Sequence, residues 1–176
     1  MQNISADANI EPFPHLVFHN FYTDEELELI WEELKYYTKP NKLFDVEEYQ
    51  GVVGYTKAKA LHLDAVYTGK NRVLSSILEV SRKVFDNQVL EPFSNLHDCC
   101  STAKQSNYDI TKVRYYHNGD YYKPHKDIFF DFLAFSYFYR EPKRFEGGNL
   151  IFPKYDYEFN CKHNSLIMMP SWVEHG

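Results

Sequence analysis

The sequence has little cysteine and no long apolar run. Cys99, Cys100 and Cys161 are too few and too irregularly spaced for a disulfide framework, so we expect reduced thiols in a cytoplasmic protein. No apolar stretch approaches the length of about 20 residues that a membrane-spanning helix needs. The N-terminus, "MQNISADANI", has neither the basic nor the apolar region of a signal peptide. These absences predict a cytoplasmic location and no membrane partner.

Positive charge is also scarce. The chain has 19 Lys and Arg against 25 Asp and Glu, a formal net charge of -6, and no basic stripe. Binding to duplex nucleic acid depends on cations that displace counterions from phosphates, so the composition argues against a nucleic-acid partner. Internal repeats and low-complexity segments are absent as well.

Aromatic residues are abundant instead. They make up 18% of the 176 residues, with 15 Tyr and 14 Phe, and 44% of the chain is hydrophobic. Such a chain can bury a sizeable core within one domain. Aromatic side chains favour β structure. We therefore expect one domain over residues 1–176 with a large share of strands.

The N-terminal part carries helical patterns. Thr23 followed by three acidic residues resembles a capping box, which predicts a helix start. Apolar residues with helical spacing follow, at Leu27, Ile30, Trp31 and Leu34. A second helix is expected over about Lys70–Phe85, with a buried stripe at Leu74, Ile77, Leu78 and Phe85. The polar segment from about Leu90 to Tyr108 is expected to be a loop.

The C-terminal part carries strand patterns. Short aromatic and β-branched runs are separated by Gly, Pro, Asn and charged residues: "ITKVRYY", "DFLAFSYFY", "NLIFP", "YDYEFN" and "SLIMMP". Closely spaced strands without a helical period are typical of a sandwich or barrel. The expected fold is mainly β with supporting helices. A double-stranded β-helix (jelly-roll) core at about 110–176 would be braced by helical N-terminal support at about 1–108.

One run, "YYKPHKDIFF", contains two metal-capable side chains, His125 and Asp127. Residues two apart in a strand point to the same face. A second histidine from another strand would complete a 2-His-1-carboxylate site, which binds Fe(II) and leaves positions open. The spacing alone is weak, because His62 and Asp64 repeat it. The tyrosines and glycine before His125 favour that pair, and we interpret the pair at His62 as structural.

Further motifs follow in order: Gly147-Gly148 in "RFEGGNLIF", then "NSLIMMPSWVEHG" with His175. From about Ile110 to Gly176 the chain resembles the 2-oxoglutarate/Fe(II)-dependent oxygenase superfamily, in its prolyl 4-hydroxylase-like branch. The family pattern has tyrosine, glycine, tyrosine, H-x-D, a strand with tyrosine, Gly-Gly-x-Leu and a distal histidine. The capped N-terminal helix resembles the usual lead-in.

The resemblance implies roles by position. His125, Asp127 and His175 would be the iron ligands and the catalytic centre. His163, in "CKHNS", is the rival third ligand, but it lies at a turn where the family has a polar bend.

Two tyrosines take cofactor-binding positions in the same comparison. Tyr115 matches a residue that lies against bound 2-oxoglutarate in the family. Tyr137 matches a strand residue that binds the distal carboxylate.

The sequence departs from the family pattern at one point. A basic residue shortly after the distal histidine anchors 2-oxoglutarate in the family, whereas the sequence stops at Gly176. We expect the natural protein to continue with that residue. Otherwise Arg114, Arg140 or Lys162 would have to replace it, and the sequence does not choose among them.

The implied activity is hydroxylation of a C–H bond, with a prolyl residue of a peptide or protein as the leading substrate. Fe(II), O2 and 2-oxoglutarate would be required, with ascorbate as a candidate reductant, and 2-oxoglutarate would yield succinate and CO2. A small molecule is the alternative to a peptide or protein as substrate. The alternatives are a cupin-type metal-binding barrel with non-oxoglutarate chemistry and a non-catalytic binding domain that retains the fold.

Overall fold

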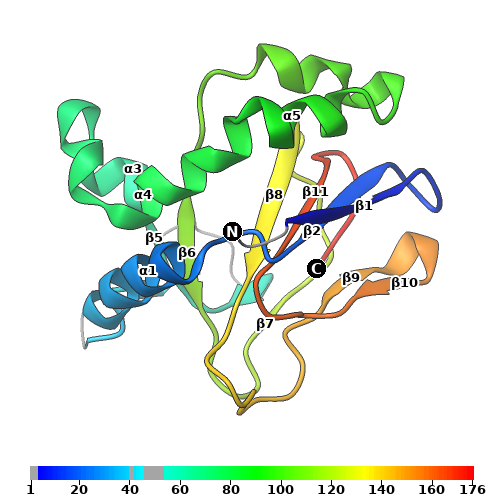
Figure 1. Cartoon of the computed structure of the whole chain (residues 1–176). Helices are drawn as coiled ribbons and strands as arrows, with labels where there is room; N and C mark the ends of the chain where they lie inside the picture. Colours follow the sequence, from blue (N-terminus) through cyan, green and yellow to red (C-terminus); the bar gives the residue numbers. More distant parts are fainter. Residues whose placement is uncertain (1–3, 40–41, 46–53) are drawn as a thin grey trace. The chain divides into compact units, whose positions relative to one another are not determined.

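The structure is a computed structural model that describes residues 4–39, 42–45 and 54–176 (Figure 1). It is a mixed architecture of antiparallel strands, α-helices and short 3-10 helices. Two compact units are present, and each joins segments that are distant in the sequence. The first unit consists of Met1–Thr23, Val84–Asn107 and Pro124–Gly176, and the second of Asp24–Lys83 and Tyr108–Lys123.

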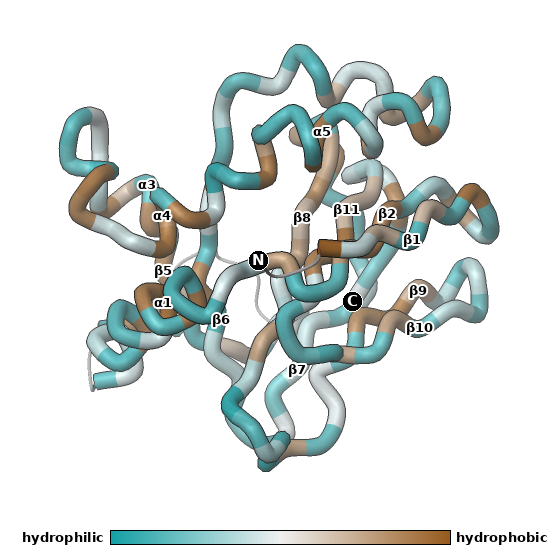
Figure 2. The backbone as a smooth tube through the Cα atoms, in the orientation of Figure 1, coloured by the Kyte–Doolittle hydropathy of each residue, from teal (hydrophilic) through white to brown (hydrophobic). Residues whose placement is uncertain are grey.

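A four-stranded antiparallel sheet organises the first unit. Its order is β1-β2-β11-β8, with bounds Ser5–Asn9, His15–His19, Ser165–Pro170 and Phe132–Tyr137. Ile167 pairs with Val17 and Phe135, so these three side chains share one face. Hydrophobic residues colour much of β8 brown in Figure 2.

A β-hairpin lies in the same unit as the four-stranded sheet. The hairpin of β9 (Leu150–Phe152) and β10 (Tyr157–Phe159) encloses η4 (Pro153–Tyr155). Beside it, Ile151 and Gly176 exchange hydrogen bonds of 2.9 and 3.0 Å. One cluster of buried side chains joins this hairpin to the four-stranded sheet: Phe13, Val17, Leu150, Phe152, Phe159, Ile167, Met169 and Val173.

Helices contact the opposite face of the four-stranded sheet. They are α5 (Asn87–Ser94) and η3 (Asp98–Gln105). Phe93 of α5 packs on Phe132 of β8 at 5.6 Å, and α5 lies beside the end of β8 in Figure 1. The prediction of a loop over Leu90–Tyr108 is therefore wrong. Pro92 inside α5 and the 3-10 geometry of η3 hide the helical period from the sequence.

The second unit contains most of the helices: α1 (Asp24–Tyr37), α3 (Leu63–Val66), η1 (Gly69–Leu74), α4 (Ser76–Ser81) and, at its boundary, η2 (Arg82–Phe85). Its sheets are β3-β5-β6 (Phe44–Asp45, Lys59–His62, Lys112–Tyr115) and β4-β7 (Thr56–Lys57, Tyr121–Tyr122). Helix α1 begins directly after Thr23, as predicted, and buries Leu27 and Ile30.

The expected continuous helix over Lys70–Phe85 is wrong. Three short helices replace it, because Ser75 is extended and its hydroxyl caps α4 by accepting from the Leu78 N–H at 3.1 Å. Ile77 and Leu78 are buried as predicted, whereas Leu74 is 69% exposed.

The five separated runs predicted as strands beyond Ile110 are present, as β6, β8, β9, β10 and β11. The fold is nevertheless mixed rather than mainly β, and the sheets formed by the described residues do not close. The jelly-roll and the single domain over 1–176 stay predictions.

"YYKPHKDIFF" was expected to be one strand carrying both ligands, and this is wrong. Only Tyr121–Tyr122 is strand, and His125 forms an isolated bridge. Ile128 and Phe129 lie in an exposed turn, with exposures of 68% and 90%. Cys99, Cys100 and Cys161 form no disulfide. Within the described ranges, no helix has the length and apolar character needed to cross a membrane.

Candidate metal centre

His125, Asp127 and His175 lie together in the first unit, as the sequence predicts. One potential ligand atom from each lies within 4.8 Å of the others. The Nε2 atom of each histidine is 3.8 Å from Oδ2 of Asp127. These separations are too long for hydrogen bonds. The three groups therefore face one another with a gap between them.

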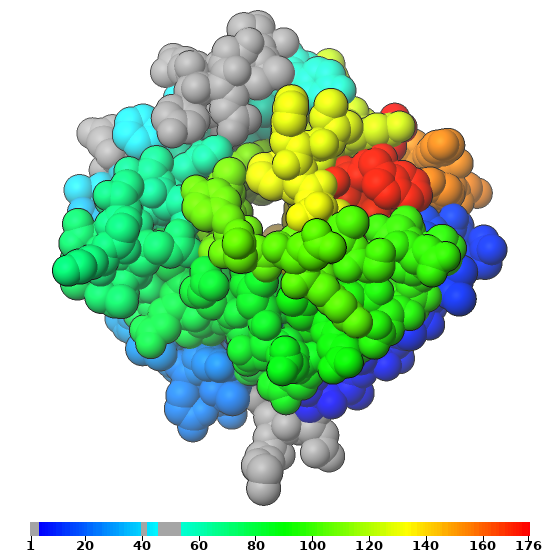
Figure 3. Space-filling model, turned by 90° about the horizontal axis from the view of Figure 1, so that it is seen from above, coloured from blue at the N-terminus to red at the C-terminus, as the bar shows by residue number. Residues whose placement is uncertain are grey.

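Main-chain pairing holds these segments together. His125 and His175 exchange both main-chain hydrogen bonds, at 2.8 and 2.9 Å. The N–H of Asp127 donates to the carbonyl of Ser171 at 3.1 Å, and the Ser171 hydroxyl donates to the carbonyl of Phe130. In Figure 3 the yellow segment that contains residue 130 lies beside the red C-terminal segment. The ligand positions are thus fixed by backbone contacts between segments about fifty residues apart in the sequence.

A backbone carbonyl orients the ring of His175. Its Nδ1–H donates to the carbonyl of Val173 at 2.9 Å, which leaves Nε2 as the nitrogen toward Asp127. Metal-binding histidines commonly have such a partner on their second nitrogen. The ring also lies 5.3 Å from Phe135 and 4.4 Å from His125, centroid to centroid. Sequence reasoning missed Val173 and Phe135, because no local pattern marks either contact.

The group could hold a divalent metal ion. Metal–ligand bonds of about 2.0–2.2 Å place neighbouring ligand atoms roughly 3 to 3.6 Å apart, so the separations of 3.8 Å, and any up to the limit of 4.8 Å, would contract on binding. Two imidazoles and one carboxylate suit non-haem Fe(II). The exposed side-chain fraction is 3% at His175, 12% at His125 and 30% at Asp127, so the group is most open at the carboxylate.

His163 lies outside this group. Its Nδ1 accepts the backbone N–H of Tyr139 at 3.1 Å, and its ring packs on that tyrosine at 5.1 Å. These contacts give His163 a structural role beside β8, and the metal-capable group contains His175 instead.

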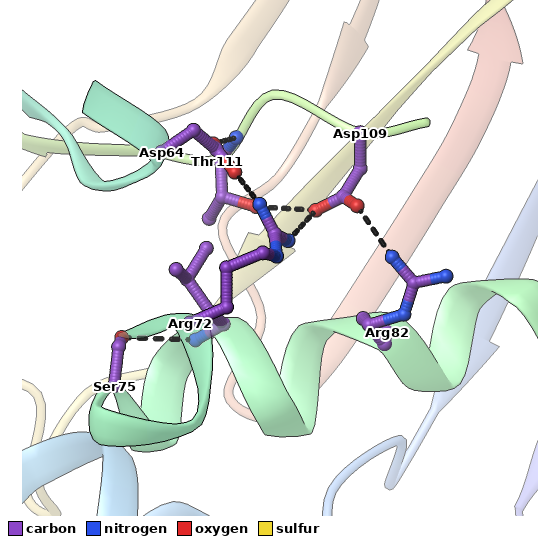
Figure 4. A network of polar contacts seen from close by, with 7 residues as sticks. Asp64, Arg72, Ser75, Arg82, Asp109 and Thr111 are labelled. Carbon is purple, nitrogen blue, oxygen red and sulfur yellow. Dashed lines mark hydrogen bonds and ion pairs between the residues drawn. The ribbon is translucent and has the colours of Figure 1, made fainter. Parts of the chain in front are cut away.

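The other H-x-D pair belongs to a network of polar contacts in the second unit (Figure 4). Asp64 accepts the N–H of Thr111 at 2.6 Å and is paired with Arg72. Asp109 accepts from Arg72 and from Arg82, both at 2.8 Å. This network joins η1 and the region of α4 to the start of β6. Asp64 is occupied by structural contacts, which agrees with the interpretation from sequence.

The predicted cofactor-binding tyrosines differ in their surroundings. Tyr137 is part-buried on β8 and shares a face with Phe135, which contacts His175. Its ring packs on Phe159 at 5.6 Å. Tyr115 belongs to β6 in the second unit, is 42% exposed and contacts His117 edge-on at 4.8 Å. Tyr137 thus lies on the same strand of the first unit as Phe135, whose ring contacts His175.

The three candidate anchors for 2-oxoglutarate also differ. Arg140 and Lys162 are exposed, whereas Arg114 is part-buried on β6 of the second unit.

Comparison of the chain with protein-family models, with curated proteins and with solved structures found no match. The functional conclusion therefore depends on the site itself and on the resemblance in its motifs.

Proposed function

We propose that the protein is a 2-oxoglutarate- and Fe(II)-dependent dioxygenase that hydroxylates a C–H bond. The observation that carries this proposal is the convergence of His125, Asp127 and His175, with ligand atoms all within 4.8 Å of one another. Their chemistry is that of the 2-His-1-carboxylate site of non-haem iron oxygenases. A prolyl residue in a peptide is the substrate to test first, because the motif resemblance is to the prolyl 4-hydroxylase-like branch.

Each ligand has a defined task in this proposal. The two imidazoles and the carboxylate would hold Fe(II) from one side and leave positions open. Iron bound in this way would supply, together with 2-oxoglutarate and O2, the oxidising power for hydroxylation of the substrate, with conversion of 2-oxoglutarate to succinate and CO2. The Val173 carbonyl keeps a proton on Nδ1 of His175, so that Nε2 is the metal-binding nitrogen.

The surroundings suit such a reaction. Phe135 packs against His175, and the buried cluster behind it excludes water from that side. The more exposed Asp127 side would admit the substrate. A jelly-roll core is part of the proposal, and it is supported by the buried cluster shared between the four-stranded sheet and hairpin β9–β10.

The deciding experiment is anaerobic addition of 2-oxoglutarate to the Fe(II)-loaded protein. We expect a visible metal-to-ligand charge-transfer band, because the keto acid would chelate the iron. The band should be lost in His125→Ala and retained in His163→Ala, a matched control whose histidine lies outside the group.

The outcomes of this experiment distinguish the proposed function from the two alternative functions. Bound iron without a band would contradict the proposal and favour non-oxoglutarate chemistry. No metal binding at all would favour a binding domain. If the band forms, release of succinate with prolyl-containing peptides, and not without them, tests the substrate.

A further inference from the structure

Arg114 occupies an unusual place in the second unit. It lies on β6 opposite Ala60 of β5, and paired residues of an antiparallel sheet point to the same face. Ala60 and Ala58 are both buried and small, and Phe44 of β3, which also pairs with Ala60, shares this face. The guanidinium stacks over the ring of Tyr122, with its Cζ 4.2 Å from the ring centroid.

The Nη1 atom of Arg114 is buried and has no hydrogen-bond partner. Across residues 4–39, 42–45 and 54–176 it is the one buried side-chain nitrogen or oxygen in this state. Arg72 and Arg82 in the same unit both donate to Asp109. Buried donors are nearly always satisfied, and a buried charge without a partner is costly. Nη1 therefore lacks an acceptor, whereas the Tyr116 and Tyr122 hydroxyls interact with the guanidinium.

The neighbourhood of Arg114 is positively charged. Lys112 shares its face of β6, and His62 pairs with Lys112 across the sheet. Burial and then the charges of Lys112 and Arg114 lower the pKa of His62. Burial opposes the charge of Arg114, but the Tyr116 and Tyr122 hydroxyls outweigh this and raise its pKa. The guanidinium thus stays protonated.

We propose that this face of sheet β3-β5-β6 binds a carboxylate through the guanidinium of Arg114. A guanidinium presents paired N–H groups that match the two oxygens of a carboxylate. The bound group would supply the acceptor that Nη1 lacks. One carboxylate matches the charge and the paired donors of one guanidinium, and phosphate is the alternative that the titration below tests.

The carboxylate can come from a free dicarboxylate or from an acidic side chain of a peptide. Both would use the same contact with Arg114, and neither requires a metal. The site is therefore testable apart from metal binding at His125, Asp127 and His175.

The test is calorimetric titration of the metal-free protein with succinate, after metal removal by 1,10-phenanthroline, which contains no carboxylate. We expect succinate to bind the wild type and Arg114→Met to weaken binding at least tenfold. Arg114→Lys should give an intermediate value, because an ammonium cannot form the paired contact. Arg144→Gln, which removes an exposed arginine, should bind within twofold of the wild type. An acidic pentapeptide is titrated in parallel. Tighter binding of the pentapeptide than of succinate would identify an acidic side chain of a peptide as the source of the carboxylate, and weaker binding would identify a free dicarboxylate.

The same titrations can overturn the proposal. No succinate binding by the wild type, or equal binding by a folded Arg114→Met variant, would do so. Tighter binding of inorganic phosphate than of succinate, lost in Arg114→Met, would refute the carboxylate assignment. Iron binding at His125 and His175 is measured on each variant. If the charge-transfer band forms but succinate does not bind, this inference is wrong and the oxygenase proposal is unaffected. If succinate binds but no band forms, only the oxygenase proposal is wrong.

Discussion

His125 and His175 exchange both of their main-chain hydrogen bonds, and their rings lie 4.4 Å apart. The two histidines are fifty positions apart in the sequence. Backbone pairing, rather than side-chain packing alone, therefore sets the spacing of the metal-capable group. Asp127 follows from the same segment and is held through Ser171.

Removing the carboxylate of Asp127 should weaken metal binding strongly. In Asp127→Ala we expect the affinity for Fe(II) or Co(II) to fall at least about 100-fold, more than is usual for loss of an outer partner. Asp131→Ala is the matched control, because Asp131 is exposed, lies outside the metal-capable group and accepts from the Ser106 hydroxyl at 2.6 Å. Anaerobic metal titration measures both. Retained affinity in Asp127→Ala would remove Asp127 from the ligand set.

The Ser171 hydroxyl should support the ligands from outside the group. Ser171→Ala would leave the Phe130 carbonyl without this donor, and we expect a loss of about 1 kcal/mol in unfolding free energy. Metal affinity should fall as well, by less than in Asp127→Ala. Ser101→Ala removes an exposed hydroxyl that donates to the Asp98 carbonyl at 2.7 Å, and serves as control. Equal metal affinities in the two variants would argue against the positioning role.

Asp64 should matter for stability and not for metal. Asp64→Ala removes a largely buried carboxylate from Arg72 and from the Thr111 N–H, with an expected cost of about 3 kcal/mol. Urea unfolding measures the loss. Metal titration of the folded variant should match the wild type, because Asp64 is outside the metal-capable group. A large loss of metal affinity would show that this second H-x-D is functional.

His15 should make stability depend on pH. Burial lowers its pKa, against the opposing hydrogen bond to the Phe13 carbonyl at 2.8 Å. The unfolded chain therefore takes up a proton near pH 6.5 before the folded protein does. This contribution is complete above that pH and is lost as pH falls toward the folded pKa.

The measurement is urea unfolding of the metal-free protein between pH 7.5 and pH 5.5. In His15→Asn the pH slope should decrease by up to one proton, or about 1.4 kcal/mol per pH unit. His19→Asn is the control, because His19 is more exposed and pairs with Asp7 at 2.9 Å. An unchanged slope in His15→Asn would contradict the assignment.

The helices and strands that were predicted correctly are those that short, local sequence patterns indicate. The short apolar run "SLIMMP" predicted β11, and the capping pattern at Thr23 predicted the start of α1. Local patterns fail where a tertiary contact decides. Ser75 interrupts a helical pattern because its extended backbone caps α4. His125 lies in a single bridge because its partner is His175, a contact that no nearby residue announces.

The candidate site was predictable only through the order of its motifs. By side-chain chemistry alone, His62 and His163 were candidate metal ligands as well. Their spacing to other residues did not distinguish them from His125 and His175. The unsatisfied Nη1 of Arg114 could not be predicted, because satisfaction depends on groups distant in sequence.

The contact between Gly176 and Ile151 extends the influence of the metal-capable group. His175 is bonded to His125 on one side, and its neighbour Gly176 is bonded to hairpin β9–β10 on the other. An ion that draws the two histidines together would restrain this whole strip of backbone. We therefore expect the amide protons of Ile151 and Gly176 to exchange more slowly once metal binds. The hairpin then reports occupancy of the centre, although it contributes no ligand to it.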